Sequence, residues 1–136
     1  MLYQKSAKMN TVKKLRSDII EMLPQVDAVK ILESIHHQLE MAAQFEEYYK
    51  QWKAETIFKS NGREILENTH YQKIINMGES AVPLILEKYV QANDHWSYAL
   101  RNITGISLNE TTHKGNLEAI RTDWIAWGVK NNFIYA

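Results

Sequence analysis

Apolar residues along this 136-residue chain recur at steps of three and four, which predicts helices rather than strands. The spacing predicts a first helix that begins at Asn10 or Thr11 and stops at Pro24, followed by a long second helix capped by Asp27. Because a short turn joins the two helices, we expect residues 10–58 to form a helical hairpin. The apolar positions of this hairpin are Val12, Leu15, Ile19, Met22, Leu23, Leu32, Ile35, Leu39, Ala42, Tyr49 and Trp52.

Turn residues divide the rest of the chain, residues 62–134, into shorter helices. Gly78 and Gly105 stand where a helix is expected to end in a left-handed residue, and Pro83 stands in a first turn, where its missing N–H costs nothing. A last helix is predicted from about residue 116 to 130. The whole pattern predicts an all-α fold with six or seven helices, in which the N-terminal hairpin packs on this C-terminal body.

Composition narrows the class of protein. Lysine and arginine number 16, as do aspartate and glutamate, so the zero net charge does not call for a polyanionic partner. The absence of cysteine excludes disulfides, thiolate metal sites and a cysteine nucleophile. No stretch is apolar enough to span a membrane, and the first residues lack the apolar run of a signal peptide, so we expect a cytoplasmic protein. Residues 1–9 are expected to form a flexible basic arm, and residues 10–136 a single domain.

The stretch from residue 76 to 105 resembles one HEAT repeat. In that repeat a first helix opens with Gly and Ala-Val-Pro, a turn with Asp follows, and the second helix carries Ala and Leu inside. The resemblance implies a paired-helix surface of the kind that binds partner proteins. The positions that carry it are Gly78, Ala81, Val82, Pro83, Leu84, Leu86, Asp94, Ala99, Leu100 and Ile103.

A longer segment, from Trp52 to Ile134, resembles a largely uncharacterised family of small bacterial proteins. This resemblance implies a shared helical fold and assigns no catalytic residue. The matching positions are Trp52, Glu55, Thr56, His70, Tyr71, Gln72, Ile74, Ile75, Met77, Gly78, Pro83, His95, Trp96, Ala99, Leu100, Ile103, Thr104, Gly105, Gly115, Trp124, Trp127 and Gly128.

Large aromatic side chains are the candidate partner-binding residues. Aromatic and arginine side chains are typical anchors of protein interfaces, and several lie on more than one side of the long second helix. The alternative interpretation is that the same rings close the core of the monomer. The candidates are Phe45, Tyr48, Tyr49, Trp52, Trp96 and Arg101.

Positive charge at the N-terminus suggests a rival function. Five basic residues precede the first acidic residue, Asp18, and such a cluster could contact nucleic-acid phosphates. No recognition helix rich in Arg, Asn and Gln follows, and the same residues also suit a solvated helix face. The candidate phosphate-contacting residues are Lys5, Lys8, Lys13, Lys14 and Arg16.

Catalytic and metal-binding motifs are weak. Glu33 and His36 lie three residues apart on one helix face, as do His37 and Glu40, but the bundle metal sites that use this spacing need further carboxylates from facing helices. The sequence contains no Gly-x-Ser-x-Gly, phosphate-binding glycine loop or His-Glu-x-x-His. We therefore expect no catalysis, metal or cofactor. The predicted function is non-catalytic protein binding, with another protein or a second copy as partner, as in an accessory, immunity or antitoxin-type subunit.

Overall fold

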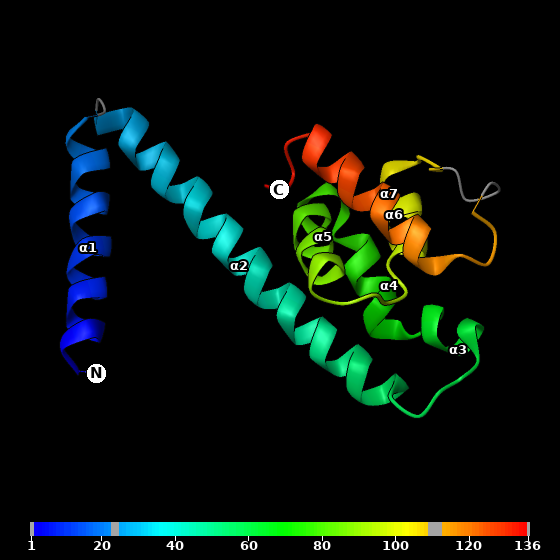
Figure 1. The fold of residues 1–136 in the computed structure, drawn as a ribbon. Coiled ribbons are helices and arrows are strands. Elements are labelled where there is room, and N and C mark those ends of the chain that lie inside the picture. Colours follow the sequence, from blue (N-terminus) through cyan, green and yellow to red (C-terminus); the bar gives the residue numbers. More distant parts are fainter. Residues whose placement is uncertain (1, 23–24, 109–112, 136) are drawn as a thin grey trace. The chain divides into compact units, whose positions relative to one another are not determined.

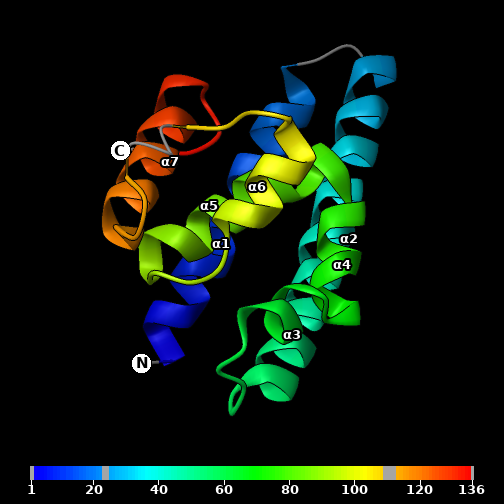
Figure 2. The same cartoon turned by 90° about the vertical axis from the view of Figure 1, so that its right-hand side faces the viewer.

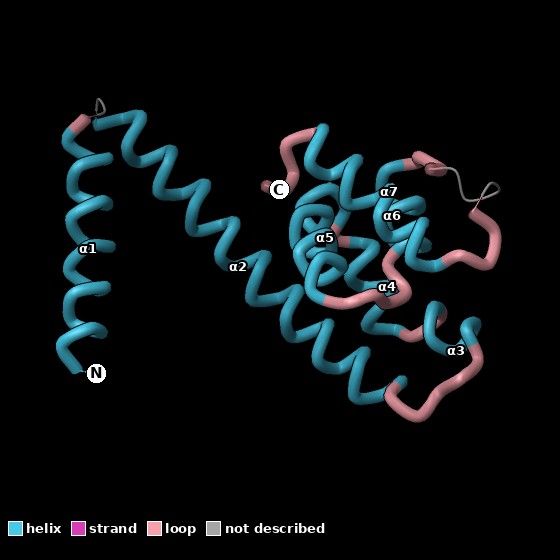
Figure 3. The backbone as a smooth tube through the Cα atoms, in the orientation of Figure 1, coloured by secondary structure: helices cyan, strands magenta, loops and turns pink. Residues whose placement is uncertain are grey.

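The computed structural model describes residues 2–22, 25–108 and 113–135, and for residues 2–9, 25 and 26 it describes the backbone alone. This part of the chain contains seven α-helices, one 3₁₀ turn and no strand, which confirms the predicted all-α class (Figures 1 and 3). The elements are α1 (Leu2–Glu21), α2 (Gln25–Thr56), α3 (Gly62–Leu66), α4 (Thr69–Asn76), η1 (Gly78–Ala81), α5 (Val82–Gln91), α6 (Ser97–Thr104) and α7 (Leu117–Lys130).

Local sequence explains where several helices begin. The side chain of Asn68 caps α4 by accepting hydrogen bonds from the backbone N–H groups of His70 and Tyr71. Asn116 caps α7 in the same way, with its Oδ1 atom 3.0 Å from the backbone nitrogen of Ala119. Pro83 lies in the first turn of α5, as predicted. Short polar side chains thus satisfy the N–H groups that a helix start leaves unpaired.

The predicted glycine stops are confirmed. Gly78 and Gly105 have φ angles of +71° and +73°, in the left-handed region that favours glycine. Gly105 ends α6, and its N–H bonds the Arg101 carbonyl. The predicted second helix is continuous through its aromatic stretch. In contrast, α1 begins at Leu2, so the backbone of residues 2–9 is helical and the expected start at Asn10 or Thr11 is too late. The caps suggested there are not used, because an earlier turn already continues the helix.

The chain divides into two units, Met1–Leu39 and Glu40–Ala136. The division between the units falls inside α2, because the C-terminal half of that helix contributes its aromatic face to the core of the second unit. The predicted single domain over residues 10–136, with parts 10–58 and 62–134, stays a prediction.

The core of the second unit is built around tryptophan and tyrosine rings. In this unit α5 packs against α7, and α6 packs against α4 (Figure 2). Trp52 of α2 is fully buried, and its ring centroid lies 5.0 Å from that of Trp96 and 4.9 Å from that of Tyr71. The indole N–H of Trp52 donates to the carbonyl of Ile65 at 3.0 Å. This bond fixes the end of α3 against α2.

Tyr71 places a polar group inside this core without leaving it unpaired. Its hydroxyl donates to the carbonyl of His95 and accepts from the backbone N–H of Ala99. Burial raises the pKa of the Tyr71 phenol, so the hydroxyl keeps its proton and remains a donor. The two bonds connect α4 to the start of α6.

No helix in the described ranges is both long enough and apolar enough to cross a membrane.

Replacing Trp52 by alanine should destabilise the protein severely. The substitution removes a fully buried ring and leaves the Ile65 carbonyl without its donor, so we expect the free energy of unfolding to fall by about 3–5 kcal/mol. Phe58→Ala is the matched control, because the Phe58 ring is 94% exposed and its loss should change stability by less than about 0.5 kcal/mol. Urea unfolding followed by circular dichroism measures both, and equal losses would contradict this core.

Candidate functional site

Three of the predicted partner-binding residues belong to the core. Phe45, Trp52 and Trp96 are each at most 1% exposed, and Trp96 lies among the rings of the other two. A side chain that contacts only its own chain cannot anchor a partner without unfolding this unit. The structure therefore supports the core interpretation for these three residues and not the surface interpretation.

Tyr48 and Tyr49 lie at the edge of the same core and are half-buried. The Lys88 ammonium lies 4.4 Å from the ring centroid of Tyr49 and 2.8 Å from a carboxylate oxygen of Glu46. The hydroxyl of Tyr48 accepts a hydrogen bond from the side-chain amide of Gln44 at 2.9 Å. The Lys73 ammonium lies 5.6 Å from the ring centroid of Tyr48, so each tyrosine ring already has a cation of its own chain beside it.

Arg101 is exposed and lines a hollow of about 460 Å³ in the second unit. Its guanidinium carbon lies 5.8 Å from the ring centroid of Tyr98. The polar atoms beside it serve the fold: Asp94 binds the Lys53 ammonium at 2.7 Å, and Ser97 accepts from the indole N–H of Trp124 at 3.4 Å. This hollow therefore has no evident catalytic arrangement among the described residues.

Among the described side chains, the basic residues predicted to contact phosphates do not all lie on one face of α1. The side chains of Lys5 and Lys8 lie outside the described residues. Lys13, Lys14 and Arg16 are exposed on α1, but a helix turns by about 100° per residue, so the Lys14 side chain points about 160° away from that of Arg16. Arg16 lines an apolar groove. The structure thus provides no specific support for a nucleic-acid interface.

The first unit has almost no core of its own. Among its described side chains, residues 10–22 and 27–39, only Ala28 is buried, with 5% of its surface exposed. The remaining side chains are exposed, although the sequence pattern gives each helix a clear apolar stripe. Because helices in water depend on burying such a stripe, this unit is incomplete as a folded core.

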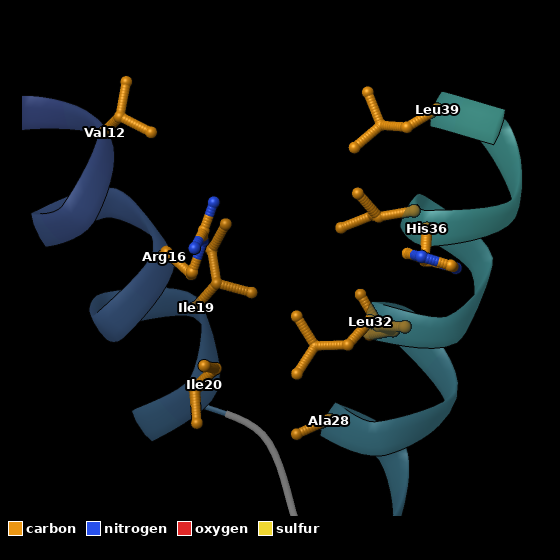
Figure 4. Close-up of a pocket in the computed structure, with 10 residues that line it drawn as sticks. Val12, Arg16, Ile19, Ile20, Ala28, Leu32, His36 and Leu39 are labelled. Carbon is orange, nitrogen blue, oxygen red and sulfur yellow. The ribbon is translucent and has the colours of Figure 1, made fainter. Parts of the chain in front are cut away.

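A groove separates the two helices of this unit. It has a volume of about 440 Å³, and all of its lining residues come from α1 and the N-terminal half of α2. Ile19 of α1 and Leu32 and Leu39 of α2 point into the space between the helices (Figure 4). Eight of the ten lining residues are apolar, and the other two are Arg16 and His36. The lining is Val12, Arg16, Ile19, Ile20, Ala28, Ile31, Leu32, Ile35, His36 and Leu39.

The exposed fractions show how open this groove is. Leu39 is 65% exposed, Val12 55%, Ile19 46% and Leu32 40%. Leu15, which continues the stripe along α1, is 58% exposed. Monomeric proteins rarely leave so many neighbouring aliphatic side chains in water, and such patches typically mark interaction surfaces. We take this groove as the candidate functional site.

Sequence periodicity locates the apolar positions of the groove but not their exposure. The periodicity of Val12, Ile19, Leu32 and Leu39 predicts that one face of each helix is buried, and it does not say what buries it. The predicted hairpin has the two helices bury each other's stripes, whereas the structure leaves these aliphatic side chains exposed.

The Glu-x-x-His pattern lies beside this groove without completing a metal site. His36 lines the groove, and Glu33 is exposed on the same helix. Within the described ranges, no three His, Asp or Glu side chains gather closely enough to hold a metal ion. What the groove offers a ligand is therefore mainly aliphatic surface.

No protein-family model, curated protein or solved structure matches this chain. The resemblances to a HEAT repeat and to a bacterial helical family stay predictions.

Tryptophan fluorescence should report that the rings are shielded. Trp52, Trp96 and Trp124 are at most 1% exposed and Trp127 is half-buried, so we expect weak quenching by acrylamide in the native protein and strong quenching in urea. A Phe58→Trp variant is the control, because it adds an indole at a position that is 94% exposed and should add a strongly quenched component. Strong quenching of the unaltered native protein would show that these rings are exposed to solvent and would contradict this core.

Proposed function

We propose that this protein is a non-catalytic protein-binding module and that its binding surface is the apolar groove between α1 and α2. One observation carries the proposal: the first unit exposes two aliphatic stripes and buries only Ala28 among its described side chains. A partner that fills the groove supplies the core that this unit lacks. The accessory, immunity or antitoxin role suggested by the sequence is compatible with such a surface and rests on analogy.

The shape and chemistry of the groove favour a helical partner. The aliphatic stripes of α1 and α2 line a groove that can accept the apolar face of a third helix. A helix satisfies its own backbone hydrogen bonds, so it can enter an apolar groove without leaving polar groups unpaired. Arg16 and His36 line the groove and provide polar contacts that can select a register.

A charge placed in the groove should abolish binding. We expect Ile19→Glu and Leu32→Glu to lose the partner, because each would bury an unpaired carboxylate in the complex. Val90→Glu is the matched control, since Val90 is a 48% exposed aliphatic residue on a helix of the second unit. Circular dichroism checks that all three variants keep their helix content.

The measurement is affinity capture with the immobilised full chain, from a lysate of the producing cells to which an untagged second copy has been added. The proposal expects a defined polypeptide, of either origin, to be retained by the unaltered chain and by Val90→Glu and to be lost with both groove variants. If the groove variants retain the polypeptide as well as the unaltered chain does, or if no polypeptide is retained at all, the proposal is contradicted.

A further inference from the structure

The groove and the stripes that line it are complementary to a second hairpin of the same kind. On α2 the apolar residues Ala28, Leu32, Ile35 and Leu39 follow one another at steps of four, three and four. This is the spacing at which helices interdigitate in four-helix bundles and coiled coils. Resting on the proposed function, we propose that the occupant of the groove is the hairpin of a second copy, so that two chains form a symmetric four-helix bundle.

The apolar area is of the size that a stable dimer needs. Eight aliphatic side chains on the two stripes keep between 37% and 65% of their surface exposed, which amounts to roughly 600 Å² of apolar surface per chain. Specific interfaces bury about 800 Å² per partner, including a polar rim, so these residues supply most of the requirement. They are Val12, Leu15, Ile19, Ile20, Ile31, Leu32, Ile35 and Leu39.

The polar residues of the groove do not oppose this assembly. Arg16 can lay its aliphatic stem along the apolar stripe and keep its guanidinium in water at the edge of the bundle. The zero net charge of the chain means that no general repulsion keeps two copies apart.

The solution mass tests the pairing directly. Light scattering of the full chain across a range of concentrations should give twice the monomer mass of 15.9 kDa, falling towards the monomer on dilution. Leu32→Glu should raise the dissociation constant of the dimer at least about tenfold, and Val90→Glu should leave it unchanged.

The outcomes distinguish this inference from the proposed function. A monomer at every concentration would overturn the inference, and the proposed function would still stand if groove variants lost a captured protein of another kind. A dimer that tolerates Leu32→Glu would show that two copies do not meet through this groove. If no polypeptide is retained in a way that depends on the groove, both the inference and the proposed function are contradicted.

Discussion

The structure depends on one constraint, which is that helix α2 must bury an apolar stripe along 32 residues. A helix in water gains little from its backbone hydrogen bonds alone and depends on packing of its apolar face. The C-terminal half of α2 meets this requirement inside the chain, because Phe45 and Trp52 lie in a core of interlocking rings. Among the described residues, the N-terminal half has only Ala28 buried.

The difference between the two halves follows from the kinds of side chain they carry. Trp52, Tyr71 and Trp96 are large enough to bridge between neighbouring elements, and their polar atoms find partners such as the Ile65 carbonyl and the Ala99 N–H. The stripes of the first unit consist of Val, Leu and Ile, which leave a hollow of about 440 Å³ between α1 and α2. Aliphatic stripes at heptad-like spacing are suited to pairing with further helices, because such side chains interdigitate without needing polar partners.

The proposed function and the proposed pairing of two copies both depend on the exposed aliphatic stripes of the first unit. Side chains such as Leu39 and Val12 are largely exposed, so a partner that covers the groove would bury them. The heptad-like steps between Leu32, Ile35 and Leu39 favour a second hairpin of the same kind as that partner. The polar residues around Arg101, by contrast, are tied into the fold through Asp94 and Ser97.

The sequence by itself determined the helices, because their signals are local. The spacing of apolar residues located them, Gly78 and Gly105 marked two stops, and Asn116 marked one start. Only the tertiary structure decided which apolar faces meet, because periodicity shows that a face is to be buried and not against what. Trp96 and Leu39 look equally apolar in the sequence, yet one is 1% exposed and the other 65%. The candidate site therefore lay among residues whose pattern was visible and whose packing was not.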